Sequence, residues 1–397
     1  MKILISVFCI KEIGGISTAV TNLLKEVHDK YEVSLCVPSN YISPRYEIPQ
    51  DVTIIQGSNL LRDAAISQKL LADQNLFQKL RRKIIRCVKR ILPRYALTNF
   101  ALDHIKINGE YDVAIAFADE GFDKKYKVGG EDFRIVLNNV KANRRIAWIH
   151  NDPKKLGWTP ELCRQELSGF DAIVNVSQEC KDIFDEIMPT YKNKSWLVYN
   201  MYDIDRIKRL SFIKKPLYNN NKLNFVTVAR INFNQKKMNR IVETCDRLVR
   251  EGYHDFVWNI VGEGPDRVAL QQQIEEKNLK SYIVIHGHQS NPYPYIKQAD
   301  AFVLTSLYEG LPMTVREAEI IGTPILTTNF GSAHEAVIDN YQGFICENSS
   351  DGVYKMIKRI LDKPEELVKI RDFLTNNPVT NKTALSQFEA VCINKEK

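Results

Sequence analysis

Short apolar runs that alternate with helix-patterned segments are the feature that most restricts the fold of this chain. The second half contains five such runs, at 223–229, 256–261, 282–286, 299–304 and 324–328. Helical spacing is found between them, at about 237–251, 266–278, 293–298 and 313–321. Continuous apolar runs are typical of parallel strands buried on both faces, and their alternation with helices predicts a doubly wound α/β domain.

The first half shows the same alternation and predicts a second domain of the same class. Its strand-like runs are 2–8, 31–37, 111–117, 145–150, 171–177 and 195–200. A helix is expected after Gly14 and Gly15, with Ser17 as its N-cap. We therefore predict two Rossmann-like parallel-sheet domains, an α/β architecture.

The boundary between the domains is placed in a polar segment. Residues 203–222, which include Lys214, Pro216 and a run of asparagines, are interpreted as an interdomain connection. The predicted domains are 1–202 and 203–378, and 379–397 is a C-terminal helix expected to pack back on the N-terminal domain. Beyond Phe344 the chain is predicted to be mainly helical, with helices at 352–362, 365–376 and 381–393.

Composition removes several classes of protein. The eight cysteines form no CxxC pair, so neither a zinc site nor a disulfide framework is indicated. No apolar run reaches the length of a membrane span, which is about 18 residues or more. The N-terminal apolar run is interrupted at Lys11 and reads as a strand rather than a signal peptide. We expect a cytoplasmic protein with reduced thiols.

A basic segment at 79–94 contains eight basic residues and no acidic one. Leu80, Ile84, Cys87, Val88 and Ile91 fall at helical spacing, which predicts an amphipathic helix that binds an anionic membrane surface from the cytoplasmic side. A solvated surface helix packed on the core is the alternative, and nucleic acid is a third. The aromatic residues expected of a single-strand binder are missing, so we predict no nucleic-acid partner.

The loop at the carboxyl end of the strand at 299–304 and the helix after it contain the largest group of candidate ligand-binding residues. Such loops bind ligands in open α/β sheets. Glu309 lies in the loop, and Glu317 lies in the helix that follows. The helix N-terminus can hold an anion, and ionised carboxylates can accept hydrogen bonds from sugar hydroxyls. The alternative is a capping box formed by Thr314 and Glu317, with Pro312 as a helix-start residue.

Other strand ends carry ligand-binding residue types. Arg230 ends one strand, and Lys236 and Lys237 follow before a helix, a pattern that suits a diphosphate. Solvated surface charges are the alternative. Gly262 opens a glycine turn at another strand end, and His150 ends a strand in the first half, where a lone histidine is more often structural. The full GxGxxG fingerprint is absent, which counts against NAD or FAD.

Taken together, these motifs resemble the retaining glycosyltransferases of family 4, which have the GT-B fold of two domains facing a cleft. The resemblance covers most of the chain and is strongest over 223–345. It rests on motifs in the family's order: Val228-Ala-Arg230 with Lys236, Val261-Gly-Glu-Gly-Pro265, Ser306-x-x-Glu309-Gly-x-Pro-x-x-x-x-Glu317-Ala and Gly322-x-Pro324. Lys237 departs from the family because many members have glycine there, so the choice between Lys236 and Lys237 stays open.

The resemblance implies a role for each matching residue. Glu317 would hold the ribose of the nucleotide, and Glu309 the transferred sugar. Arg230 and Lys236 would bind the diphosphate and stabilise the leaving group. His150 would reach the donor sugar. The remaining expected nucleotide-sugar-binding residues are Gly15, Gly262, Gly310, Leu311, Pro312, Met313 and Thr314.

The implied activity is transfer of a sugar from a nucleotide diphosphate donor, a UDP-sugar, with retention at the anomeric carbon. No cofactor or metal is expected, because the basic pair would replace the cation. The departing phosphate would help to deprotonate the acceptor, and a covalent route through Glu309 is the alternative. A lipid-linked acceptor in surface polysaccharide assembly is the expected partner. The rival functions are a nucleotide-sugar epimerase of GT-B fold and a non-catalytic sugar-nucleotide-binding subunit.

Overall fold

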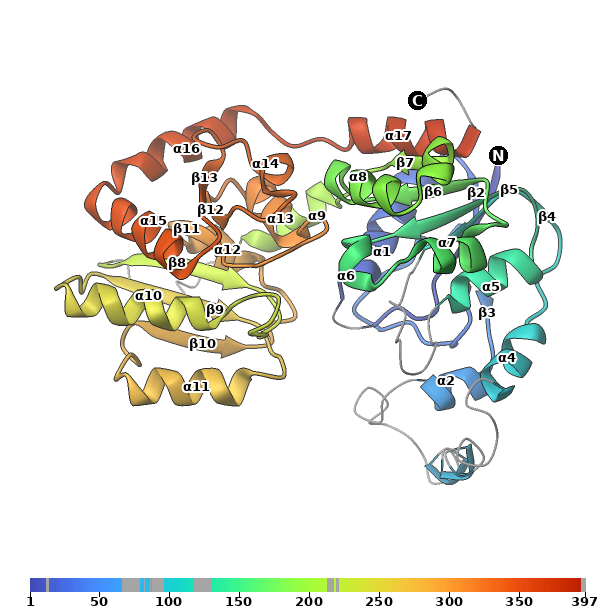
Figure 1. The fold of residues 1–397 in the computed structure, drawn as a ribbon, viewed down its shortest axis with the longest axis horizontal. Coiled ribbons are helices and arrows are strands. Elements are labelled where there is room, and N and C mark those ends of the chain that lie inside the picture. The colour runs from blue at the N-terminus through green and yellow to red at the C-terminus, as the bar shows by residue number, and fades with distance from the viewer. Residues whose placement is uncertain are drawn as a thin grey trace. The chain divides into compact units, whose positions relative to one another are not determined.

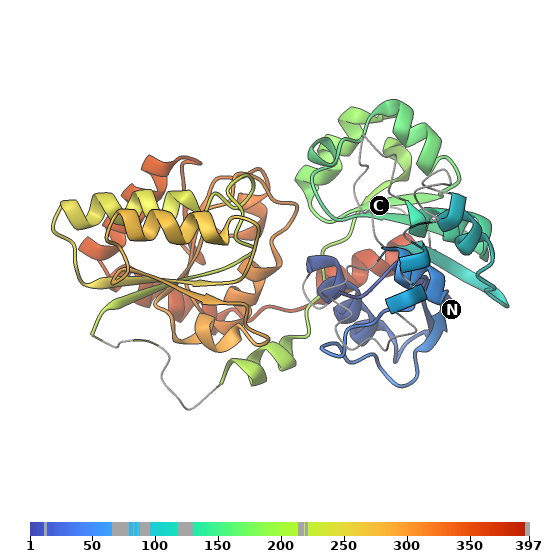
Figure 2. The ribbon, with the colours of Figure 1, turned by 90° about the horizontal axis from the view of Figure 1, so that it is seen from below.

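The structure is a computed structural model that describes residues 1–11, 14–65, 79–81, 83–85, 87, 96–117, 130–212, 218 and 221–393. It divides into two compact units (Figures 1 and 2). The first contains 1–176, 180–201 and 382–397, and the second contains 177–179 and 202–381. The chain therefore leaves the first unit after Met201 and returns to it at Lys382.

The first unit is built on a parallel sheet of seven strands in the order β3-β2-β1-β4-β5-β6-β7. Its strands are β1 Lys2–Ser6, β2 Glu32–Val37, β3 Thr53–Gln56, β4 Glu110–Ala116, β5 Lys141–Ile149, β6 Ala172–Asn175 and β7 Ser195–Leu197. Its described helices are α1 Gly15–Val27, α2 Asn59–Ala65, α4 Ala96–Asp103, α5 Glu131–Asn138, α6 Pro153–Leu156, α7 Pro160–Leu167, α8 Gln178–Ile187, the 3-10 helix η2 Pro189–Lys194 and α17 Lys382–Ile393. The strand order reverses between β1 and β4, so the loops after these strands are neighbours.

The second unit has a parallel sheet of six strands in the order β10-β9-β8-β11-β12-β13. Its strands are β8 Leu223–Val228, β9 Phe256–Val261, β10 Ile283–Gly287, β11 Ala301–Leu304, β12 Ile325–Thr328 and β13 Gly343–Cys346. Its described helices are α9 Ile204–Ser211, α10 Asn239–Arg250, α11 Arg267–Glu276, α12 Tyr293–Gln298, α13 Met313–Ile321, α14 Ala333–Ala336, α15 Ser350–Asp362 and α16 Glu365–Asn376. Here the strand order reverses between β8 and β11, so the loops after these strands are neighbours.

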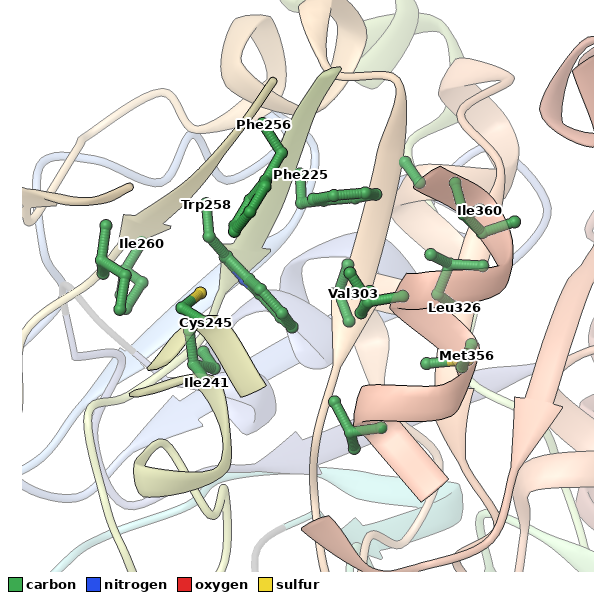
Figure 3. Packing of buried hydrophobic residues seen from close by; sticks show 14 of the residues in the cluster. Phe225, Ile241, Cys245, Phe256, Trp258, Ile260, Val303, Leu326, Met356 and Ile360 are labelled. Carbon is green, nitrogen blue, oxygen red and sulfur yellow. The ribbon is translucent and has the colours of Figure 1, made fainter. Parts of the chain in front are cut away.

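The core of the second unit shows why its strand sequences are continuously apolar. Figure 3 shows Trp258 of β9 beside Cys245 and Ile241 of α10, and Val303 of β11 on the side toward α15, which carries Met356 and Ile360. Both ribbon views place α10 and α11 on the same face of the sheet. On the other face, α9, α12 and α13 pack together. Burial on both faces confirms the predicted doubly wound class.

Several local predictions were wrong. β3 and β13 were missed, the first because its TIIQ sequence is largely exposed and the second because GFIC begins with glycine, which is unfavourable in strands. Ser17 is not an N-cap: α1 begins at Gly15, and the Ser17 hydroxyl accepts from the Lys11 backbone N–H at 2.9 Å. The connection expected at 203–222 contains α9, which packs against α12 and α13 within the second unit.

The amphipathic helix predicted at 79–94 lies partly outside the described residues, which here are 79–81, 83–85 and 87. These residues are helical, and the buried one lies outside the predicted apolar face. Ile85 is buried, whereas Leu80 and Ile84 are each 56% exposed. Arg81 bonds Asp63 of α2 from its Nε at 2.6 Å. The expected apolar face is therefore open at Leu80 and Ile84.

Candidate functional site

The loop between β11 and α13, residues 305–312, is called here the Glu309 loop. It follows the central strand beside the reversal of strand order, and α13 begins at Met313 directly after it. Pro312 occupies the N-cap position and no side chain caps the helix. The alternative interpretation, a capping box formed by Thr314 and Glu317, is therefore wrong, because Thr314 lies inside the first turn. An uncapped N-terminus can donate backbone N–H groups to an anion.

Glu309 is 7% exposed and is held by three side chains. The Lys236 ammonium pairs with its Oε1. The Ser306 hydroxyl donates to the same oxygen at 2.6 Å, and the Gln235 amide donates to Oε2 at 3.4 Å. A buried carboxylate needs such partners. Because two donors hold Oε1, Oε2 is the oxygen with more capacity for a ligand hydroxyl.

Arg230 and Lys236 lie in the loop after β8, next to the Glu309 loop. Arg230 is exposed, and its Nη2 donates to Gln235 Oε1 at 3.4 Å. Gln235 therefore bridges this guanidinium and Glu309. Lys237 has a φ of 51°, a left-handed conformation that favours glycine. The structure brings the Lys236 ammonium to Glu309, which places a lysine and an arginine beside one carboxylate.

Glu317 and Glu319 are both buried on α13 but differ in their partners. Glu317 is 6% exposed and accepts from the Tyr293 hydroxyl of α12 at 3.4 Å. Glu319 pairs with Arg316 and accepts from Gln342 at 2.6 Å. Burial raises the pKa of Glu319. Glu319 is thus committed to bonds within the unit.

Position 262 requires glycine because the backbone of the neighbouring loop, at Ala229, passes too close to leave room for a side chain. A Cβ on Gly262 would lie 2.0 Å from the carbonyl oxygen of Ala229, and the φ of Gly262 is 153°. The backbones of the loops after β8 and β9 pair here, because the Ala229 N–H donates to Val261 at 3.1 Å. Gly262 consequently fixes the loop that carries Arg230.

Two predicted residues belong to the first unit. Gly15 is the first residue of α1, and an added Cβ would meet no described atom within 4 Å. His150 follows β5, and its Nε2 donates to the Phe117 carbonyl at 2.6 Å in the neutral tautomer. Burial lowers the pKa of His150 to about 4, so the ring is neutral at physiological pH.

Within the second unit the structure brings together Arg230, Lys236 and Glu309, and places Gly310, Leu311 and Pro312 between Glu309 and α13. Sequence reasoning missed Gln235 and Tyr293, and it named Ser306 as a motif residue without giving it a role. Ser306 and Gln235 each neighbour a predicted site or motif residue, but hydroxyl and amide side chains are common in loops. Their bonds to Glu309 depend on which strands are adjacent.

Comparison with known proteins gives a family match for part of the chain. Residues 208–374 match the family described as glycosyl transferases group 1. An uncharacterised glycosyltransferase of Methanocaldococcus jannaschii is 30% identical over 203 residues, 49% of each chain. UDP-Gal:alpha-D-GlcNAc-diphosphoundecaprenol alpha-1,3-galactosyltransferase of Escherichia coli is 25% identical over 245 residues, 61% of this chain and 57% of the relative. The chain thus spans about half the length of the curated relatives it matches.

Solved structures extend the likeness over both units. Anabaena HepE in complex with UDP and glucose has a TM-score of 0.68 at 14% identity, and the match covers 99% of each chain. WaaG, a glycosyltransferase involved in lipopolysaccharide biosynthesis, has a TM-score of 0.61 at 13% identity over 100% of each chain. At these identities the likeness shows the fold.

Proposed function

We propose that the chain, which has the GT-B fold and matches the glycosyl transferases group 1 over residues 208–374, transfers a sugar from a UDP-sugar with retention. The observation that carries the proposal is the buried Glu309, which Lys236 and Ser306 hold beside an uncapped helix start. A carboxylate accepts hydrogen bonds from sugar hydroxyls. Cations and a helix N-terminus bind the diphosphate and stabilise the charge that develops on the leaving group.

Each group has a distinct part in the proposed reaction. The exposed Arg230 guanidinium binds two phosphate oxygens at once, and the N–H groups at the start of α13 bind the phosphate nearer the sugar. Lys236 stabilises the charge that develops as the sugar–phosphate bond breaks. Glu309 accepts from sugar hydroxyls and Glu317 from the ribose. With two protein cations at the diphosphate, the proposal needs no metal.

Nucleotide release from a panel of UDP- and GDP-sugars tests this proposal. Arg230→Ala should lower turnover by about a thousandfold, as loss of a charged group at a developing charge does. Glu317→Ala should lower kcat/KM by about tenfold or more, because the ribose hydroxyls lose their acceptor. Glu276→Ala and Arg250→Ala, exposed residues of the same types, are the controls. Normal turnover in the site variants would refute the assignment. Conversion of the donor without an acceptor would indicate an epimerase, and binding without turnover a non-catalytic subunit.

The acceptor is proposed to be a lipid-linked glycan of surface polysaccharide assembly, at the cytoplasmic face of the membrane. The name of the Escherichia coli relative includes a diphosphoundecaprenol acceptor. Among the described helices, none combines the length and apolar character needed to cross a bilayer. Exposed Leu80 and Ile84, flanked by exposed Lys79 and Lys83, suit adsorption to an anionic surface instead.

Liposome flotation tests the membrane contact. Lys79→Glu with Lys83→Glu should abolish binding to vesicles rich in phosphatidylglycerol, because each basic residue near such a surface contributes about 1 kcal/mol. Lys280→Glu with Lys355→Glu makes the same change in charge in the second unit and should leave binding intact. Equal binding by both double variants would refute the role of the 79–94 segment.

A further inference from the structure

Four consecutive backbone carbonyls of the Glu309 loop accept hydrogen bonds from side chains of four different segments. These bonds are Arg240 Nη1 to Thr305 at 3.0 Å, Thr328 Oγ1 to Ser306 at 2.6 Å, Asn348 Nδ2 to Leu307 at 3.0 Å and Gln235 Nε2 to Tyr308 at 3.3 Å. The donors come from α10, the end of β12, the segment after β13 and the loop after β8. The loop backbone is therefore fixed independently of any ligand.

Arg240 is the most unusual of these donors. It lies on α10 and is 7% exposed, and burial lowers its pKa. Its hydrogen bonds to described residues go to neutral acceptors: Thr305 O, Asn348 Oδ1 at 2.7 Å and Asn348 O at 3.0 Å. A buried cation costs desolvation free energy, which hydrogen bonds to neutral groups offset only in part.

Arg240 determines which way the Asn348 amide points. A guanidinium only donates, so the amide oxygen must face it, and the amide nitrogen must face the other way. That nitrogen donates to Leu307 O at 3.0 Å and to Asn329 O at 3.3 Å. Asn348 thereby connects Arg240 with a loop carbonyl two residues before Glu309.

We propose that Asn348, oriented by Arg240, is a positioning residue that fixes the Glu309 loop and, through it, the carboxylate of Glu309. The backbone on the other side of Leu307 is held as well, because its N–H donates to Gln235 O at 2.8 Å. Leu307 is thus held on both sides, which limits the movement of Glu309. The link to catalysis rests on the function proposed above, whereas the loop positioning does not.

Asn348→Asp separates positioning from ordinary stability. Aspartate has the same shape and still accepts from Arg240, now as a charge-assisted pair. The aspartate has no N–H to donate to the Leu307 carbonyl, so a carboxylate oxygen and that carbonyl oxygen, both acceptors, face each other. We expect the thermal midpoint to be unchanged or higher, while amide hydrogen exchange in peptides covering 305–312 accelerates about tenfold. Unchanged exchange in those peptides would overturn the proposal.

Asn377→Asp is the matched control. The Asn377 amide also donates to a backbone carbonyl, that of Phe373 at 2.9 Å, at the end of α16. Its substitution should leave exchange in the 305–312 peptides at the wild-type rate. Arg240→Lys keeps the positive charge but loses the planar guanidinium, whose two nitrogens donate to Thr305 and Asn348. It should accelerate exchange in the 305–312 peptides as Asn348→Asp does. Wild-type exchange in Arg240→Lys would contradict the part of the proposal that concerns Arg240.

Turnover of UDP-glucose and UDP-galactose then tests the catalytic link. Asn348→Asp should lower kcat about tenfold and leave the Kd of UDP within about twofold, since Glu309 faces the sugar rather than the nucleotide. In a Glu309→Gln background it should have no further effect. A further loss of kcat in the Glu309→Gln background would contradict the link between Asn348 and catalysis through Glu309. A loss of UDP affinity as large as the loss of kcat would contradict it too. Equal turnover of wild type and Glu309→Gln would reject the proposed function, and the exchange result would still decide the positioning.

Discussion

The loops after β1 and β11 both lie beside the reversal of strand order in their sheets, on opposite sides of it, and their surroundings differ. Each follows a strand at the reversal of strand order and precedes a helix. In the second unit, side chains hold the loop carbonyls at 305–308. In the first unit, Gly15 has open space where a side chain would project. The second unit therefore fixes this loop through side chains, whereas the first unit leaves space for a side chain at the start of α1.

Gly262→Ala should have the largest effect, because the loops of the second unit are closely packed. The new Cβ would lie 2.0 Å from the Ala229 carbonyl oxygen. We expect a loss of about 4 kcal/mol in the unfolding free energy of this unit, from overpacking and backbone strain together. Urea unfolding followed by hydrogen exchange in β8 and β9 measures it.

Gly322→Ala is the control for that measurement. Gly322 has a φ of 82°, and an added Cβ would meet nothing within 4 Å. It should cost about 1 kcal/mol, the penalty for a left-handed conformation alone. Equal losses of unfolding free energy in the two glycine variants would show that the contact with the Ala229 carbonyl oxygen adds nothing to the cost of a side chain at position 262.

His150 should make the first unit acid-sensitive. Its pKa is lowered by burial to about 4, so the unfolded chain binds the proton more readily between that value and about 6.5. Stability therefore falls as the pH falls, by about 2 kcal/mol from neutral pH to about pH 5. Unfolding midpoints at both pH values, for wild type and His150→Gln, measure this. A wild-type pH slope in the variant would exclude His150 as the cause.

Thr328→Val tests one bond of the Glu309 loop with little change in shape. The hydroxyl donates to the buried Ser306 carbonyl at 2.6 Å, and its loss should cost about 1.5 kcal/mol. Thr323→Val removes a similar bond, to Ile296 O at 2.9 Å, outside the loop. Both should lower the thermal midpoint, but only Thr328→Val should also lower nucleotide release. Equal turnover in the two variants would contradict the importance of a fixed loop.

Gly15→Ala should have the smallest effect on stability. The added methyl meets open space at the start of α1, and the unfolded chain loses freedom, so we expect a gain of about 0.5 kcal/mol. If that space is for a ligand, KM for the sugar substrates should rise while the thermal midpoint rises slightly. A variant with raised stability and unchanged KM would place the ligand elsewhere.

The sequence allowed the fold class to be predicted because strands buried on both faces are apolar throughout. Phe256–Val261 and Met313–Ile321 were predicted with the observed bounds. The exposed edge strand Thr53–Gln56 has no such pattern and was missed. The N-cap at Ser17 was mispredicted and the alternative cap at Thr314 is absent, because both residue types suit N-caps and only the backbone shows where a helix begins.

For the candidate site, residue types could be predicted but their bonds could not. Arg230, Lys236 and Glu309 follow from motifs at strand ends. The pairing of Lys236 with Glu309 joins residues 73 apart and requires β8 beside β11. Asn348 lies after a strand that was itself missed, so no pattern indicated its bond to Leu307.

The return of the chain to the first unit sets an order for its synthesis. α17 belongs to that unit, where Phe388 is fully buried with its ring centroid 6.4 Å from that of Trp148, and Arg144 donates to Val391 O at 2.7 Å. A ribosome makes residues 202–381, which form the second unit together with 177–179, before it makes α17. The unit begun first is therefore completed last, and a nascent chain without α17 leaves the surface around Trp148 uncovered.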